Sequence, residues 1–349
     1  MKTTLRRLAG LGALLLAALA FATGDMAPPA AGLHADARDQ RNPEQTFLTY
    51  PEWFLVFSPD EYASLLQTRS SSDFPWFRHI GQFWSGYGKV IEATRQYPFN
   101  SEYHTMIVVI GTSTTVEFGI KGAYETLVGR LTEFTAPINA TPEDQLAARQ
   151  AQDYVDFIRV RPWYEFDFAA RLKQLWTQTP MTGPHLLRKW ERRYLLTSEW
   201  TIKAIYGWAL GTATQSTFAA PLETTVAVVQ GLPNEAGAML PSLRRLRANG
   251  DETLVELPRY HAFTGAATAL AERGVRFVEI AGNRGDILVS SVMPVATADI
   301  PGVRVMIRQP ILTRPGYERR VLQVPVARLG DVLASSARNG LAVEHVFDY

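Results

Sequence analysis

The sequence VEFGIKGAY at residues 116–124 recurs as SEWTIKAIY at residues 198–206. Each copy places a glutamate four residues before a lysine, as Glu117 and Lys121 in the first and as Glu199 and Lys203 in the second. Side chains four residues apart are neighbours on an α-helix, and glutamate before lysine is the favourable order, worth ~0.2–0.5 kcal/mol on an exposed helix. Both copies are therefore predicted to be helices with one polar spot each.

The surroundings of the two copies differ. Around the first copy, apolar residues recur at helical spacing and leave Glu117 and Lys121 on a separate stripe. Around the second copy, apolar residues point in nearly every direction, and a helix of that kind is buried in protein or in lipid. We expect the two helices to pack near each other, with Lys203 as the more buried of the two lysines.

The composition is that of a folded protein with room for two domains. The chain has 349 residues, of which 46% are hydrophobic, and a net charge of +1. This near-neutral charge, without a long basic run, argues against nucleic acid as a partner. The sequence contains no cysteine, which excludes disulfides, thiolate nucleophiles and cysteine-based metal or haem sites.

The first residues have the layout of an export signal. Lys2, Arg6 and Arg7 precede an apolar run over residues 8–22 that ends in small residues suited to cleavage. We predict a signal peptide at residues 1–22; the alternative is an uncleaved N-terminal anchor, although the run falls short of the ~20 residues that span a bilayer. Residues 23–44 are predicted to be a flexible linker outside any core. The protein is thus expected to be exported, and to be periplasmic or membrane-anchored facing the periplasm.

Residues 45–215 are predicted to form an aromatic-rich helical domain. Ser58 followed by Pro59 predicts the start of one helix, and Thr141 followed by proline predicts another. The β-branched run at residues 107–110 fits either a strand or the interior of a long helix over residues 101–133. We favour the long helix, because no comparable partner strand is nearby.

A change in composition marks the end of this domain. All eight tryptophans lie between Trp53 and Trp208, and neither tryptophan nor lysine occurs beyond Leu222. We place a domain boundary near residues 215–222. The following residues, 222–349, carry strand patterns with a hairpin turn at Asn249-Gly250.

A second internal similarity lies in this C-terminal part. The sequence VELP at residues 255–258 and the sequence LQVP at residues 322–325 are each followed by a helix pattern, a glycine and a further strand pattern. Two such units with hairpin strands between them are typical of the split βαβ of a ferredoxin-like fold. The predicted fold class is α+β, with a helical N-terminal domain followed by a ferredoxin-like antiparallel-sheet domain. That topology hosts many unrelated functions.

No catalytic or cofactor motif stands out. The six histidines lack metal-ligand spacing, and the nucleophile-elbow, dinucleotide and phosphate-loop signatures are absent, so we predict neither a metal nor a cofactor. Arg161, beside an adjacent Trp-Tyr pair, is a candidate anion clamp, and pairing with Glu165 at a helix corner is the structural alternative. The two Glu/Lys pairs have the same two interpretations: a ligand or proton site, or ion pairs between packed helices.

These observations give one function hypothesis and two alternatives. The first is an exported cell-envelope protein that binds a small ligand or a protein partner without catalysis, with membrane association through the N-terminus. The second is an enzyme whose pocket lies between helices and uses His104, Glu117, Glu199 and Arg161 as acid, base and anion clamp. The third is a membrane-embedded protein with spans near residues 104–124 and 194–214, in which the basic residues of 188–193 lie on the cytoplasmic side. The candidate ligand-binding residues are His104, Glu117, Lys121, Arg161, Glu199 and Lys203.

Overall fold

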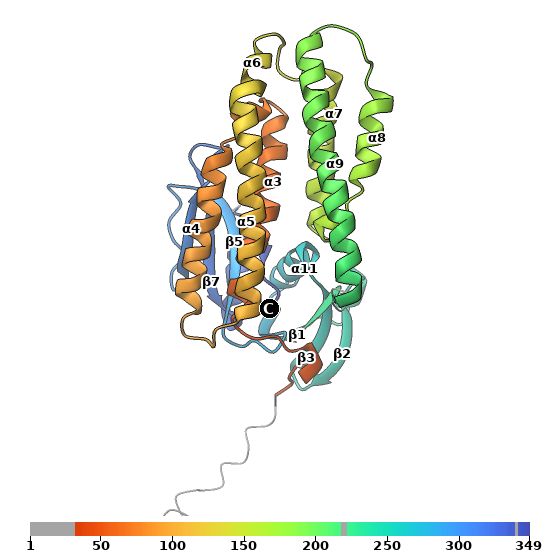
Figure 1. Ribbon diagram of the computed structural model, residues 1–349. Coiled ribbons are helices and arrows are strands. Elements are labelled where there is room, and N and C mark those ends of the chain that lie inside the picture. Colours follow the sequence, from red (N-terminus) through yellow and green to blue (C-terminus); the bar gives the residue numbers. More distant parts are fainter. Residues whose placement is uncertain (1–31, 218–221, 339–340) are drawn as a thin grey trace, which may run out of the picture.

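A computed structural model describes residues 32–217, 222–338 and 341–349 of the chain, and the predicted signal segment 1–22 lies outside these ranges. The protein is an upright bundle of helices standing beside and above two antiparallel sheets (Figure 1). The α+β class is thereby confirmed, with helices in the N-terminal part and the strands after them.

The N-terminal part consists of long helices joined by short turns. Its helices are α2 (Gln45–Leu48), α3 (Tyr50–Leu66), α4 (Trp76–Thr94), α5 (Ser101–Tyr124), α6 (Arg130–Glu133), α7 (Pro142–Ile158), α8 (Phe168–Gln178) and α9 (Leu186–Thr217). Single turns of 3₁₀-helix lie at η1 (Ala37–Asp39), η2 (Ser71–Asp73) and η4 (Trp163–Glu165). A π-helical turn, η3 (Glu125–Gly129), links α5 to α6, so the predicted long helix over residues 101–133 is confirmed with one irregular turn.

The helix starts match the sequence in one place and differ in another. Thr141 caps α7 by accepting a hydrogen bond from the Asp144 amide, as predicted. The expected start at Ser58 is wrong, because α3 begins at Tyr50 and runs through Pro59 without a break. Ser58 is fully buried inside this helix, where its hydroxyl faces His79.

The C-terminal part forms two sheets of four strands. The first contains β1 (Thr224–Gln230), β2 (Arg244–Asn249), β3 (Glu252–Pro258) and β4 (Arg276–Ile280), with helices α10 (Ala236–Met239) and α11 (His261–Ala271) in the connections. The second contains β5 (Asp286–Pro294), β6 (Arg304–Pro310), β7 (Tyr317–Pro325) and β8 (Ala342–Val346), with helix α12 (Val326–Arg338). The strand orders are β2-β3-β1-β4 and β6-β7-β5-β8.

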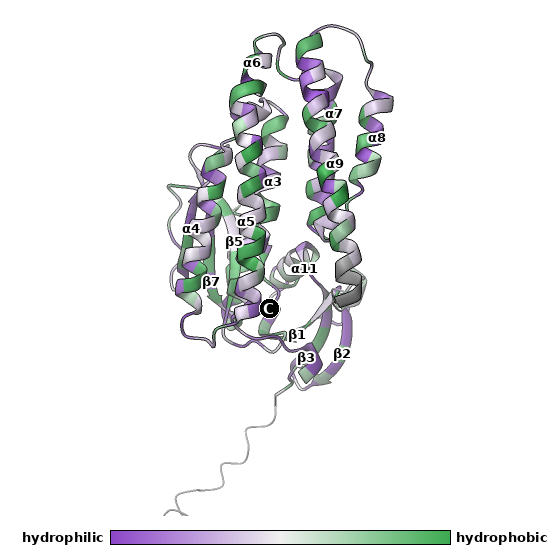
Figure 2. Cartoon of the chain, viewed as in Figure 1, coloured by the Kyte–Doolittle hydropathy of each residue, from purple (hydrophilic) through white to green (hydrophobic). Residues whose placement is uncertain are grey.

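Each sheet carries its own split βαβ unit. Strand β1 lies between β3 and β4 and is antiparallel to both, and β5 lies between β7 and β8 in the same way. A ferredoxin-like fold would combine both units in a single sheet. The observed arrangement differs because each unit brings its own preceding pair of strands, which complete a sheet without the other unit. Strand β2 is an arginine-rich, exposed edge and is purple in Figure 2.

The two sheets share one hydrophobic core. Helix α11 contacts β8 of the second sheet, helix α12 contacts β4 of the first, and the two helices contact each other. Phe263 of α11 and Leu329 of α12 are both fully buried in this core.

The predicted flexible linker, which the structure describes from residue 32 onward, is packed against the first sheet at Ala35 although most of its other described residues are not buried. Ala35 is buried against Val226, Val228 and Leu254 of the first sheet. Its amide donates to Glu279 at 2.7 Å, so this stretch adds to the sheet's packing rather than lying free.

The helical part also packs on the second sheet. Phe47 and Phe54 from the N-terminal helices form one buried cluster with Leu288, Val321 and Phe347 of the sheet part. The predicted boundary near residues 215–222 falls where α9 ends, and the independent folding of the two parts stays a prediction. The apolar cluster shows that the two parts are in close contact.

Candidate functional site

The four residues of the repeated Glu/Lys pattern meet between α5 and α9. Lys121 Nζ donates to Glu199 Oε2 at 2.8 Å, and Lys203 Nζ donates to Glu199 Oε1 at 3.0 Å. Lys203 Nζ also lies 2.9 Å from Glu117 Oε1. The sequence prediction that the two helices pack near each other agrees with this geometry. We call these four residues the central ion-pair network.

Each lysine of the central network lies over two aromatic rings. Lys121 Nζ is 4.8 Å from the ring centre of Tyr62 and 4.9 Å from that of Trp76. Lys203 Nζ is 5.5 Å from the ring centre of Tyr154 and 5.7 Å from that of Phe168. Both ammonium groups therefore have a carboxylate and two π faces as neighbours, an environment that holds a cation in place of water.

Burial in the central network is uneven among the carboxylates and similar for the lysines. Side-chain exposure is 15% for Glu199 and 44% for Glu117, and it is 12% for Lys121 and 18% for Lys203. The expectation that Lys203 is the more buried lysine is therefore wrong. Many apolar residues of α9 point outward to the surface. They therefore do not shield Lys203 from solvent more than Lys121 is shielded.

Electrostatics fix the charges of this network. Burial by itself raises the pKa of Glu199, but Lys121 and Lys203 outweigh it and lower that pKa to about 2. Burial likewise lowers the pKa of each lysine, and the carboxylates reverse the effect, so both lysine pKa values are raised. At neutral pH, Glu199, Lys121 and Lys203 are therefore charged and paired, and the shifted pKa values of these three groups make proton transfer to or from them unfavourable at that pH.

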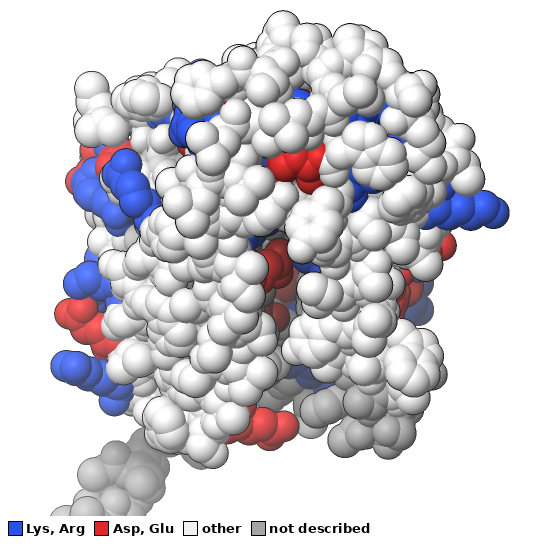
Figure 3. Space-filling view, turned by 45° about the horizontal axis from the view of Figure 1, so that its top comes forward, with Lys and Arg blue, Asp and Glu red and all other residues white. Residues whose placement is uncertain are grey.

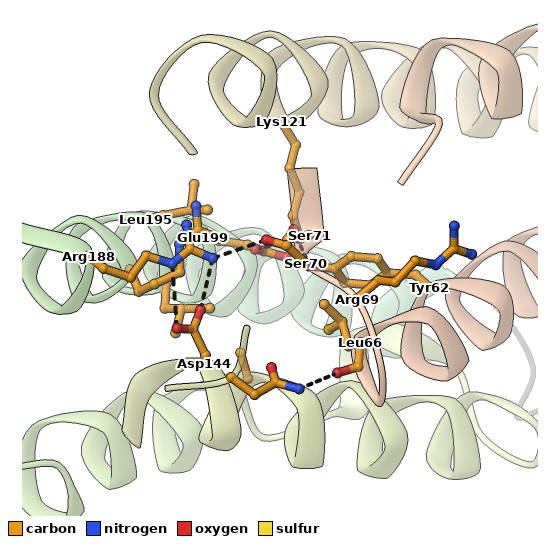
Figure 4. Close-up of a pocket in the computed structure, with 14 residues that line it drawn as sticks. Tyr62, Leu66, Arg69, Ser70, Ser71, Lys121, Asp144, Arg188, Leu195 and Glu199 are labelled. Atoms are coloured by element: carbon orange, nitrogen blue, oxygen red, sulfur yellow. Dashed lines mark hydrogen bonds and ion pairs between the residues drawn. The ribbon is translucent and has the colours of Figure 1, made fainter. Parts of the chain in front are cut away.

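A small cavity adjoins the central network (Figure 4). Lys121 and Glu199 lie on its wall, together with Tyr62, Ser70, Asp144 and Arg188. The space open to the centres of water-sized molecules is about 20 Å³. A single water needs ~10–15 Å³ by this measure, so the cavity suits ordered water and is too small for a metabolite.

A second, denser charge cluster fills the bundle near the start of α9. The basic residues of the segment 188–193, predicted to lie at a membrane surface in the third hypothesis, point into the protein instead. Lys189 and Arg193 both pair with Glu143, while Arg188 pairs with Asp144. Arg192 pairs with Glu125 and Glu191. We call this cluster the upper ion-pair network: Glu125, Glu143, Asp144, Arg188, Lys189, Glu191, Arg192 and Arg193.

The π-helical turn η3 makes room for this cluster. Glu125, its first residue, is fully buried and accepts two hydrogen bonds from Arg192, at 2.8 and 2.9 Å. A side chain at Gly129 would collide with that carboxylate and with Arg192. The irregular turn and the glycine thus serve the ion pair, and the sequence contains no signal that would have paired Glu125 with Arg192.

Two sequence-predicted site residues lie outside both networks. His104 is buried near the start of α5, with its Nδ1 2.9 Å from the Tyr87 hydroxyl and its ring stacked on Phe99. Arg161 is exposed and lies 4.0 Å from Glu165. The proposed grouping of His104 and Arg161 with the two glutamates is therefore wrong, because these two side chains face other parts of the protein.

A serine, a histidine and a glutamate also come together, and no sequence motif predicted this grouping. Ser58 Oγ lies 3.0 Å from His79 Nδ1, and His79 Nε2 lies 3.6 Å from Glu61 Oε2. Burial raises the pKa of Glu61 to about 7 against the opposing effect of Arg319, and burial together with Arg319 lowers the pKa of His79 to about 3. All three side chains are buried. This group does not line the cavity beside the central network, and we assign it no catalytic role.

The outer surfaces of α5 and α9 reverse the usual distribution of polarity. Over residues 186–212 of α9, no charged side chain is exposed, and over residues 105–124 of α5 the one exposed charge is Glu117, which points to Lys203. Large apolar side chains are exposed instead. We call this surface the apolar outer face, and its members are Met106, Val108, Val109, Val116, Ile120, Leu186, Leu187, Trp190, Tyr194, Ile202, Ile205, Tyr206 and Trp208.

The space-filling view shows the same surface (Figure 3). The centre of the view is white, charged atoms lie toward the edges, and a few more are visible in the hollow between the helices. Helix α4 has an ordinary amphipathic surface by comparison, with Arg78, Lys89 and Glu92 exposed to solvent.

None of the helices in the described part of the chain combines the length and the apolar character needed to cross a membrane. This finding disagrees with the alternative of spans near residues 104–124 and 194–214. Both segments carry the charges of the central network.

No protein-family model, no curated protein and no solved structure matches the chain, so its function is inferred from the arrangement described above.

Proposed function

We propose that this is an exported protein of the cell envelope that acts by binding a partner through the apolar outer face of α5 and α9. One observation carries the proposal: over most of two long helices the charges point inward and the large apolar residues point outward. Water favours the opposite distribution on a surface helix. The apolar outer face is therefore suited to being covered when the protein works.

The size of this face supports the same conclusion. The largest apolar patch of a typical monomer measures ~300–600 Å². Trp190, Tyr194, Tyr206 and Trp208 are each between 43% and 73% exposed. These four aromatic side chains alone would expose roughly 450 Å², since an aromatic side chain has ~150–250 Å² of surface. The aliphatic members add to this area, so the exposed apolar surface of the two helices taken together exceeds that of the largest patch on a typical monomer.

Catalysis is the weaker proposal for this geometry. The central network is closed by ion pairs, its cavity has room only for water, and His104 and Arg161 lie elsewhere. A protein that only binds a partner does not require a free acid, base or anion-binding side chain. The ion pairs then serve to link α5 to α9.

Two features of the chain support a duplicated origin and an exported location. The two sheets have equivalent strand orders, and each lysine of the central network lies over two rings from the two helices that precede its own long helix, α3 and α4 for Lys121 and α7 and α8 for Lys203. For export, the layout of residues 1–22 suggests a cleaved signal. The intact mass of the protein from its native host should then show the loss of about 20–22 residues.

Cysteine accessibility in cells tests the binding proposal. The chain has no cysteine, so a single one can be introduced as Ile120→Cys or Ile202→Cys in the apolar outer face. Val295→Cys is the matched control, because Val295 is a similarly exposed apolar residue after β5. A water-soluble maleimide that does not cross the inner membrane is added to spheroplasts.

We expect residue 295 to react while residues 120 and 202 are protected, and all three to react in the purified monomer. Equal reactivity of the three positions in spheroplasts would show that nothing covers the face. Reaction of residue 295 only after cell lysis would contradict export.

A further inference from the structure

We infer that the occupant of the apolar outer face is the hydrocarbon region of a lipid bilayer, which the face enters from one side. This inference rests on the proposed function and names its partner. A lipid, a second copy of the chain and another protein would each bury apolar surface, so the choice depends on how the charges are arranged.

The first argument is the inward turn of the charges. Arg188, Lys189, Arg192 and Arg193 would all be free to reach water on a solvated helix, yet each is at most 4% exposed and paired with a carboxylate. Charged residues in membrane proteins show this behaviour, because they face the protein interior and pair there. A helix whose outer side faces water would normally expose such cations, whereas this helix buries four of them within six residues.

The second argument is what the face lacks. Protein interfaces are on average only ~57% apolar, with a polar rim and about one hydrogen bond per 100–200 Å². Over residues 186–212 the exposed side chains of α9 are apolar or aromatic apart from a single threonine, Thr212. On α5, the exposed polar side chains over residues 105–124 are Thr105, Thr112, Ser113 and Glu117, and Glu117 is paired with Lys203. Over residues 105–124 and 186–212, a protein partner would therefore find one exposed charge and few hydroxyl groups to fix its orientation, whereas lipid chains need none.

The third argument is the mixture of residues. Trp190, Tyr194, Tyr206 and Trp208 stand among aliphatic residues such as Ile202 and Ile205. Tryptophan and tyrosine are enriched where a protein passes from lipid headgroups into hydrocarbon, because their rings are apolar with a polar edge.

The geometry allows contact with lipid on one side only. The opposite side of the bundle, formed by α7 and α8, exposes Arg149, Asp153, Asp156 and Lys173. These charges belong in water, so the bundle as a whole does not enter the bilayer. One-sided association of this kind buries side chains ~5–10 Å below the headgroup boundary, a depth that the side chains of α5 and α9 can reach.

The experiment uses the full chain with a single cysteine at position 120, 202 or 295, each labelled with an environment-sensitive fluorophore. Vesicles of phosphatidylcholine are added, because a neutral lipid tests hydrophobic contact rather than charge attraction. A second set of vesicles carries a nitroxide quencher on the acyl chains. Circular dichroism of each labelled protein shows whether the fold is kept.

We expect a blue shift at positions 120 and 202 on addition of vesicles, with loss of fluorescence when the lipid carries the quencher, and neither effect at position 295. The three proteins differ only in the labelled position, so binding through an N-terminal apolar segment alone would leave positions 120 and 202 unquenched. Such a result would overturn the lipid inference.

A blue shift at 120 and 202 before any vesicle is added, together with a doubled mass, would also overturn it and assign the face to a second copy. In both of these outcomes the protection of the two residues in spheroplasts would still support the proposed function. Reaction of all three cysteines in spheroplasts would contradict the proposed function itself.

Discussion

Lys121 Nζ on α5 lies 2.8 Å from Glu199 Oε2 on α9, so the lysine of the first sequence copy is paired with the glutamate of the second. The sequence predicts Glu/Lys pairs within each helix, and within α9 that pair is formed as well. Glu199 therefore pairs with two lysines at once, while Glu117 pairs with Lys203 and is more exposed.

This asymmetry predicts different costs for the two glutamates. Glu199→Gln removes the one carboxylate that pairs with Lys121, and leaving a buried charge unpaired costs ~3–5 kcal/mol. Because Glu199 keeps 15% exposure, we expect a loss near the lower end of that range. Glu117→Gln should cost about 0–1 kcal/mol, because Lys203 retains Glu199. Unfolding in urea, followed by circular dichroism, measures both; equal costs would contradict the network as described.

A second prediction concerns which lysine substitution restores stability to the Glu199→Gln variant. In the Glu199→Gln background, Lys121 has lost its carboxylate and Lys203 still has Glu117. Lys121→Met should therefore recover part of the lost stability, whereas Lys203→Met should not. The sequence alone would have favoured Lys203→Met, since Lys203 is on the same helix as Glu199. A double-mutant cycle separates the two pairings.

The upper network gives a third prediction. Glu143 has no exposed side-chain surface and pairs with both Lys189 and Arg193. Glu143→Gln should thus leave two cations without a full partner and destabilise the fold by at least ~3–5 kcal/mol. Glu191→Gln is the matched control, because Arg192 keeps Glu125 and Arg188 keeps Asp144. Its cost should stay within ~1–3 kcal/mol.

The sequence predicts the elements of this protein better than their assembly. The helical period around Glu117 and Glu199, the cap at Thr141 and the strand patterns after residue 222 depend on neighbours along the chain, and the structure confirms them. The helix start at Ser58 failed for the same reason. A serine followed by proline is a local signal, and the packing of the upstream residues Phe47, Tyr50 and Phe54 on the sheet extends the helix past it.

Long-range pairing could not be predicted from one sequence. The basic segment 188–193 has the composition of a solvated or membrane-facing patch, and only the arrangement of α5, α7 and α9 shows that its charges meet Glu125 and Glu143 inside the bundle. For the candidate site, the repeated sequence pattern names the four residues that meet between α5 and α9, and their role as a ligand site stays a prediction. The sequence also named His104 and Arg161, which lie elsewhere in the structure, because residue type alone does not fix the direction of a side chain.

Stability should also depend on pH through Glu61. Burial raises the pKa of this carboxyl from 4.5 to about 7 in the folded protein, although Arg319 opposes the shift. The folded state therefore binds more protons than the unfolded state between these values. This contribution is fully present below pH 4.5 and is lost as the pH rises through 7, by on the order of 3 kcal/mol at most.

Glu61→Gln should remove that dependence, because glutamine does not titrate. The free energy of unfolding of Glu61→Gln relative to the native sequence is expected to be more favourable at pH 8 than at pH 5. Glu272→Gln, at an exposed position after α11, is the control and should change nothing at either pH. A relative stability of Glu61→Gln that is independent of pH would show that Glu61 stays ionised beside Arg319.

Residues 222–349 are predicted to fold when expressed alone. The core between the two sheets, including Phe263 and Leu329, is built entirely from this part of the chain. The fragment should unfold cooperatively but be less stable than the full chain, because Leu288, Val321 and Phe347 lose the cover of the N-terminal helices. The exposed surface should also bind an apolar dye.

Val321→Thr distinguishes a folded fragment with an uncovered face from a loosely collapsed one. In the full chain, Val321 is fully buried against the N-terminal helices, and a hydroxyl there should cost about 1–3 kcal/mol. In the fragment, the same side chain faces water, so the substitution should have little effect on stability and should reduce dye binding. If the fragment shows no cooperative transition while the full chain does, the second sheet requires the helices that cover it, and the boundary near residues 215–222 does not separate independent domains.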